Sequence, residues 1–79
     1  MKVGTIRLKN SEDVSLVCAI LNTYTWDVDA VCGRYCVDGK SVIALFMLLE
    51  QDIDIYLHCS VPDMHKEMRK ELEEWLVIS

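Results

Sequence analysis

The chain has 79 residues, 52% of them hydrophobic, and a formal net charge of −5. This length allows one domain over residues 1–79 and leaves no room for a second core. Acidic residues outnumber basic ones by 13 to 8, and no block of Lys or Arg occurs. We therefore expect neither nucleic acid nor a membrane surface as a partner, because both require a positive patch.

The N-terminal segment carries no signal for export. Met1 and Lys2 lead directly into the first predicted strand without an apolar h-region, and the longest apolar run, 42–49, is too short to cross a bilayer. We therefore expect a cytoplasmic protein. In that reducing compartment the four cysteines should remain free: Cys18, Cys32, Cys36 and Cys59.

The cysteines and the carboxylates are the candidate metal ligands of this sequence. The alternative to free cysteines is a zinc site formed by Cys32, Cys36, His58 and Cys59. The chain lacks the Cys-x2-Cys pair that is typical of such sites. The acidic residues alternate with apolar ones, as on the solvated face of a strand: Asp27, Asp29, Asp52 and Asp54. The sequence therefore predicts no metal and no cofactor.

The first half of the chain predicts a strand, a helix and a hairpin. Residues 2–9 form the strand, and Ser11 is expected to cap the helix that follows. Apolar residues at helical spacing continue to Tyr24. Residues 26–30 alternate as a strand with Trp26 facing inward, and a turn at Gly33 leads to another strand over residues 34–37.

The second half predicts a short helix, a strand and a final helix. Ser41 is a good N-cap for the apolar segment 42–49, which we interpret as a helix. Residues 52–59 alternate for eight positions and form the clearest strand. Ser60 is expected to cap a last amphipathic helix, whose face exposed to water should contain the ion pairs Arg69–Glu73 and Lys70–Glu74.

The order βαββαβα predicts an α+β fold. Four strands with one apolar face and three helices to cover it give a two-layer, open-faced sandwich with an antiparallel sheet.

This order and several segments resemble the HPr family, the histidine-containing phosphocarriers of the sugar phosphotransferase system. Residues 37–45 (Val-Asp-Gly-Lys-Ser-Val-Ile-Ala-Leu) end a strand, place a Lys-Ser pair and open a short apolar helix, as in that family. The acidic strand 52–60 and the acid-rich final helix are similar too. The resemblance covers nearly the whole chain and implies the HPr-like sandwich.

The phosphoryl site that the resemblance implies is degenerate. In HPr, a His after the first strand accepts phosphoryl from Enzyme I, and an Arg holds the phosphoryl oxygens. The corresponding residues here are Ser11, Glu12, Asp13, Val14 and Ser15. They supply no imidazole and no guanidinium, and two carboxylates stand at a helix end that would otherwise attract an anion. His58 and His65 lie too far along the chain to substitute. We therefore expect no enzymatic activity.

The Lys40-Ser41 segment carries the other implied features. In many HPr proteins the corresponding Ser is phosphorylated by a kinase, which makes Ser41 a candidate regulatory site beside its role as a cap. The family's hydrophobic docking patch would correspond to Ile43 and Phe46, although both could instead belong to the core.

Three functional hypotheses follow. The favoured one is a non-catalytic protein-binding or regulatory module whose partner is a phosphotransferase-system component or regulator. The second is a phosphoryl carrier with an altered acceptor, such as Asp13 forming an acyl phosphate. The third is a structural or oligomerisation module, with the chain as a monomer or weak homodimer.

Overall fold

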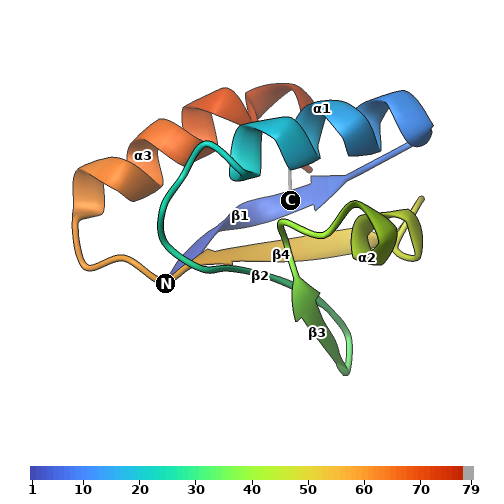
Figure 1. Cartoon of the computed structure of the whole chain (residues 1–79), viewed down its shortest axis with the longest axis horizontal. Coiled ribbons are helices and arrows are strands. Elements are labelled where there is room, and N and C mark those ends of the chain that lie inside the picture. The colour runs from blue at the N-terminus through green and yellow to red at the C-terminus, as the bar shows by residue number, and fades with distance from the viewer. Residues whose placement is uncertain (78–79) are drawn as a thin grey trace.

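The computed structural model describes residues 1–77 and shows a four-stranded sheet with three α-helices on one face (Figure 1). The elements in chain order are β1 (Lys2–Arg7), α1 (Ser11–Leu21), β2 (Val28–Cys32), β3 (Tyr35–Asp38), α2 (Val42–Phe46), β4 (Asp52–Leu57), α3 (Pro62–Glu71) and the 3-10 turn η1 (Glu73–Trp75). The predicted α+β open-faced sandwich, with the order βαββαβα, is confirmed.

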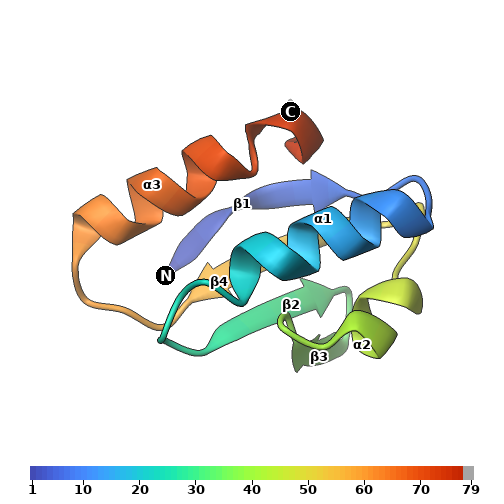
Figure 2. The ribbon, with the colours of Figure 1, turned by 45° about the horizontal axis from the view of Figure 1, so that its top comes forward.

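The strands lie in the order β1-β4-β2-β3, and all neighbours are antiparallel. The last strand of the chain, β4, therefore lies between the first two, and α1 and α3 run across the sheet on the same side (Figure 2). Strands β2 and β3 form a two-residue hairpin in which Cys32 pairs with Tyr35. Gly33 adopts a φ of 58° in this turn, a conformation that side chains with a Cβ disfavour.

The core lies between the sheet and the helices. The alternation in β4 is as expected, since Ile53, Ile55 and Leu57 are fully buried while the residues between them face the open side. Each of the three helices contributes fully buried side chains: Val14, Val17 and Leu21 from α1, Leu45 from α2 and Met68 from α3. None of the helices over residues 1–77 is long and apolar enough to cross a membrane.

Two details of the first half differ from the prediction. Strand β1 ends at Arg7 rather than at residue 9. Trp26 is exposed rather than inward, because β2 begins only at Val28 and the segment before it is irregular. Alternation of apolar and polar residues alone did not locate the start of this strand.

The C-terminal region differs more. The N-cap of α3 is Val61, without a side-chain cap hydrogen bond, and not Ser60 as predicted. Pro62 occupies the first turn, where the lack of an N–H costs nothing, and this sets the helix start one residue later. The helix ends at Glu71, and Arg69 donates to the Val3 carbonyl oxygen at 2.9 Å, which ties α3 to β1.

The chain after η1 returns to the sheet. Leu76 forms an isolated antiparallel bridge with Ile6, and the Val77 N–H donates to the Thr5 carbonyl oxygen at 2.8 Å. This segment carries Trp75 to the N-terminal end of α1, the region where the resemblance to HPr implies the phosphoryl site.

Candidate functional site

The N-terminus of α1 is closed by two side chains of the chain itself. Asn10, not Ser11, is the N-cap: its Oδ1 accepts from the Asp13 N–H at 2.9 Å. In return, Asp13 Oδ2 accepts from the Lys9 N–H at 2.9 Å. Ser11 is the first residue of the helix and is exposed, so its hydroxyl is not the cap that the sequence predicted.

The carboxylate of Asp13 is held in its ionised form. Its pKa is lowered chiefly by the hydrogen bond from the Lys9 N–H and next by a hydrogen bond from the Trp75 side chain, with smaller contributions from the Lys9 charge and the Asn10 backbone. The Asn10 side chain therefore takes one of the donors that a helix N-terminus offers to a bound anion, and the Asp13 carboxylate adds a negative charge beside the others.

A shallow hollow of about 350 Å³ lies beside this carboxylate, lined in part by Arg7, Asp13, Glu74 and Trp75. The only guanidinium at its wall, that of Arg7, is directed to Asp52, with Nη2 at 2.7 Å and Nε at 3.0 Å from Oδ1. Sequence reasoning missed both Arg7 and Trp75. No local pattern could have indicated them, because strand pairing brings them here from before and far after the predicted site.

The predicted degenerate residues do not form one surface. Val14 is fully buried and belongs to the core, whereas Ser11, Glu12 and Ser15 are exposed. Of the five, Asp13 alone lines the hollow.

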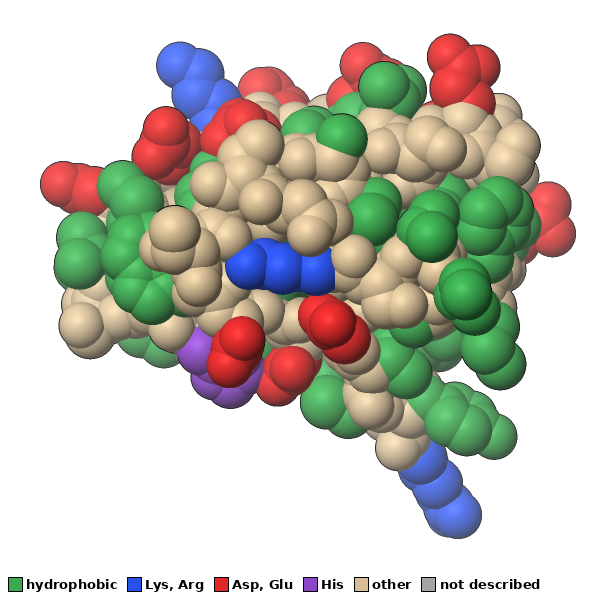
Figure 3. Space-filling view, in the orientation of Figure 1, with side chains coloured by type: hydrophobic (Ala, Val, Ile, Leu, Met, Phe, Trp, Pro, Cys, Tyr) green, Lys and Arg blue, Asp and Glu red, His purple; other side chains and the backbone are tan. Residues whose placement is uncertain are grey.

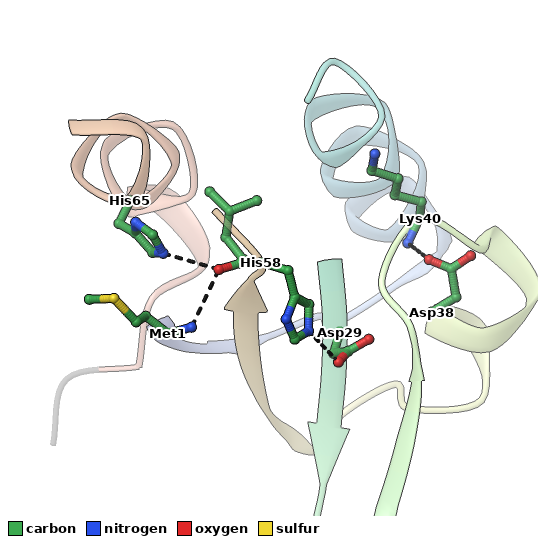
Figure 4. A network of polar contacts seen from close by, with 7 residues as sticks. Met1, Asp29, Asp38, Lys40, His58 and His65 are labelled. Atoms are coloured by element: carbon green, nitrogen blue, oxygen red, sulfur yellow. Dashed lines mark hydrogen bonds and ion pairs between the residues drawn. The ribbon is translucent and has the colours of Figure 1, made fainter. Parts of the chain in front are cut away.

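The two histidines lie at the other end of the sheet. Arg7 pairs with Asp52 near α1, whereas His58 follows the opposite end of β4. His58 Nε2 is 2.6 Å from Asp29 Oδ2 on the open face, and His65 Nε2 is 3.1 Å from the Leu57 carbonyl oxygen (Figure 4). The other ring nitrogen of His65, Nδ1, is 3.1 Å from the Val61 carbonyl oxygen. Neither imidazole can serve as an acceptor at α1.

Three carboxylates on the acidic face of the sheet have side-chain partners within the chain. Asp52 pairs with Arg7, and Asp29 pairs with His58. Asp54 accepts from the Thr5 hydroxyl at 2.6 Å and lies 3.1 Å from the Lys2 ammonium. The Thr5 hydrogen bond, followed by the Lys2 contacts, lowers the pKa of Asp54.

The cysteines and histidines do not gather into a site. Cys36 and His58 are exposed on the open face, whereas Cys59 is buried in the core. Within residues 1–77, no group of three or more His, Cys, Asp or Glu side chains is arranged to hold a metal ion.

Ser41 caps α2, and the residue before it anchors the start of this helix. The Ser41 Oγ accepts from the Ala44 N–H at 3.3 Å. The Lys40 ammonium donates to the Tyr24 carbonyl oxygen, and the Lys40 carbonyl oxygen accepts from Asn22 Nδ2 at 3.1 Å. The segment is thereby fixed against the end of α1, and the backbone N–H of Lys40 also bonds to Asp38 (Figure 4).

The outward side of α2 is apolar and exposed. We call the four residues that form it the α2 surface: Val42, Ile43, Phe46 and Met47. Ile43 and Met47 are 72% and 76% exposed, whereas Leu45 and Leu48 on the other side of the segment are buried. Hydrophobic side chains gather on the right of the space-filling view, where the ribbon shows α2 (Figures 1 and 3).

An apolar hollow of about 300 Å³ lies between this helix and β3. It is lined by Tyr35, Val37, Ala44, Met47, Leu48 and Gln51. Tyr35 is 71% exposed at its rim. Sequence reasoning named Ile43 and Phe46 but missed Tyr35 and Met47. Both lie in or beside very short elements, which cannot bury every apolar side chain, and this could have indicated their exposure.

No family model matches this sequence, and no similar protein was found among curated proteins or solved structures. The kinship with HPr stays a hypothesis that rests on the residues quoted above and on the shared sandwich architecture.

Proposed function

We propose that this chain is an HPr-like, non-catalytic protein-binding or regulatory module that acts in the cytoplasm. The observation that carries the proposal is the α2 surface, which combines four exposed apolar side chains on a helix whose other side is anchored in the core. Exposed apolar clusters of this kind are typical of protein-interaction sites.

The closed N-terminus of α1 supports the non-catalytic part of the proposal. Phosphoryl transfer requires a nucleophilic acceptor and cationic groups that stabilise the developing charge. Asp13 is bonded to the Lys9 N–H, and Arg7 is paired with Asp52. A phosphoryl group would therefore meet a carboxylate and no free guanidinium.

The docking role is tested by affinity capture from extracts of the host with three baits. Ile43→Glu places a charge in the α2 surface, and Leu16→Glu places the same charge at an exposed apolar residue of α1. A partner that docks on α2 is retained by the wild type and by Leu16→Glu. Its affinity falls by about 30-fold or more for Ile43→Glu, as for a hot-spot residue. Equal retention by all three baits contradicts the proposal.

The carrier hypothesis is tested separately with Enzyme I and labelled phosphoenolpyruvate. We expect no label on the protein, because neither Asp13 nor another residue beside it has the setting of an acceptor. Acid-labile or hydroxylamine-sensitive label that is lost with Asp13→Asn would instead establish an acyl-phosphate carrier. Phosphorylation of Ser41 by a kinase remains compatible with the binding module, since Ser41 stands next to the α2 surface.

A further inference from the structure

Strand β3 is an edge of the sheet, and its outward hydrogen-bonding groups can be identified from its register. Residues 35–38 pair with β2, and the Gly39 N–H donates to the Val28 carbonyl oxygen at 2.8 Å. Hydrogen-bonded and non-hydrogen-bonded pairs alternate along an antiparallel ladder. Tyr35, Val37 and Gly39 therefore bond to β2, while the backbone groups of Cys36 and Asp38 point away from the sheet.

The opposite edge is different, because the chain itself covers part of it. Leu76 bridges Ile6, and the Val77 N–H donates to the Thr5 carbonyl oxygen at 2.8 Å. Within residues 1–77, β3 is thus the edge not covered by another strand, although the Asp38 carbonyl oxygen at its end already accepts from the Ser41 N–H at 3.1 Å. Unprotected edges of this kind pair readily with a further strand.

We propose that β3 pairs antiparallel with β3 of a second copy of this chain, with Cys36 opposite Cys36 of the second copy. Outward residues must face outward residues, so the register can shift only by two residues at a time. The proposed register places Arg34 opposite the second copy's Asp38 and Asp38 opposite its Arg34. In the next allowed register, Arg34 would instead lie opposite Lys40 of the second copy. That register is disfavoured, because directly opposed like charges destabilise a strand pair.

The same register fits the apolar side of the strand. Tyr35 and Val37 face α2, whereas Cys36 and Asp38 line a hollow on the open face beside Asp29. Tyr35 of one copy comes to lie opposite Val37 of the other, at the rim of the other copy's apolar hollow. Two largely exposed Tyr35 rings would thereby be removed from water in one symmetric contact.

The interface is small, since β3 has four residues. It falls below the 1,200–2,000 Å² or so of stable complexes, so we expect a reversible dimer that forms at high micromolar concentration. This proposal does not rest on the proposed function, because it depends on the edge of β3 and on Arg34 and Asp38.

Sedimentation equilibrium of the full chain, over a concentration series that reaches about 1 mM, tests the pairing. Arg34→Glu alone and Asp38→Arg alone each place like charges at both contacts between positions 34 and 38. We expect each variant to weaken association by about 2- to 30-fold. In an equimolar mixture of the two variants, both pairs are attractive again, so the dimer should return as a heterodimer. Circular dichroism checks that each variant folds, since Asp38 also accepts from the Lys40 N–H.

The controls separate this register from a general effect of charge. Lys66→Glu changes the net charge as Arg34→Glu does, but at an exposed residue of α3, and should leave association unchanged. Cys36→Pro removes an outward N–H that the fold does not use and should abolish the dimer. A wild type that stays monomeric at about 1 mM overturns the proposal, as does equal weakening by Lys66→Glu or a mixture that does not associate.

Crosslinking gives a second readout of the register. The Cα atoms of a directly opposed hydrogen-bonded pair lie about 5.5 Å apart, within the range that a disulfide can span. Diamide takes the two thiol hydrogens and leaves a disulfide, so we expect a covalent Cys36–Cys36 dimer, identified by mass spectrometry. The crosslink should persist with Cys32→Ser and disappear with Cys36→Ser, and a dimer linked through Cys32 would contradict this register.

Discussion

Truncation of Leu45 tests whether α2 is held by one buried side chain. The helix has five residues, too few to be stable alone, and Leu45 is fully buried while Ile43 is 72% exposed. Leu45→Ala removes three carbons, worth about 2.4 kcal/mol of transfer free energy at about 0.8 kcal/mol each. The cavity left behind raises the expected loss in the free energy of unfolding to about 2–5 kcal/mol.

Urea unfolding followed by circular dichroism measures this loss, with Ile43→Ala as the matched control on the same helix. Ile43→Ala should change the free energy of unfolding by less than about 0.5 kcal/mol, because its side chain is already in water. A domain of this size has a total stability of only about 4–12 kcal/mol. If Leu45→Ala is strongly destabilised, Leu45→Met, which conserves volume, keeps the measurement possible. Equal losses for Leu45→Ala and Ile43→Ala would refute the assignment of α2's buried and exposed sides.

Three further predictions concern a cap, a turn and an acidic side chain. Ser41→Ala should lower the free energy of unfolding by about 1 kcal/mol in urea titrations, because it removes the bond to the Ala44 N–H. Gly39→Ala should cost about 1–3 kcal/mol in the same assay, since the new Cβ would lie 2.9 Å from Val28 Cγ1 and 3.2 Å from its carbonyl oxygen. Asp54→Asn should destabilise at pH 7, and its difference from the wild type should shrink as the pH falls below 3.8. The folded-state pKa of Asp54 is lowered, so its contribution is complete above its ordinary pKa of 3.8 and is lost as the pH falls through the lowered value.

The strands and the layer arrangement followed from the sequence because their signals are local and strong. The alternation from Asp52 onward fixed both faces of β4, and the cap at Ser41 is where the sequence placed it. Helix starts were less secure because neighbouring polar residues compete. Asn10 and Ser11 can both cap, and in the structure Asn10 is the residue that accepts from the Asp13 N–H. At α3, Pro62 selected Val61 over Ser60.

The surroundings of the α1 terminus could not be predicted, because they are assembled by long-range pairing. Trp75 reaches Asp13 only because the chain turns back at η1 and Leu76 bridges Ile6. The predicted ion pair Lys70–Glu74 placed residue 74 inside the last helix, whereas that helix ends at Glu71 and Glu73–Trp75 form the 3-10 turn. A pattern of periodic apolar residues does not reveal where a helix yields to a 3-10 turn.

These contacts bear on what the α1 terminus can still do. Loss of an acceptor alone would leave a helix N-terminus open to anions. Here the Asp13 carboxylate accepts from the Lys9 N–H, and Trp75, which ends η1 just before the residues that pair with β1, lines the same hollow. The closure is therefore part of the packing that holds the C-terminal residues to the sheet. A histidine introduced at position 13 would lose the carboxylate that accepts from the Lys9 N–H, and the guanidinium of Arg7 would still be engaged by Asp52. The side chains of the α2 surface, by contrast, are largely in water, so we expect binding to depend on them.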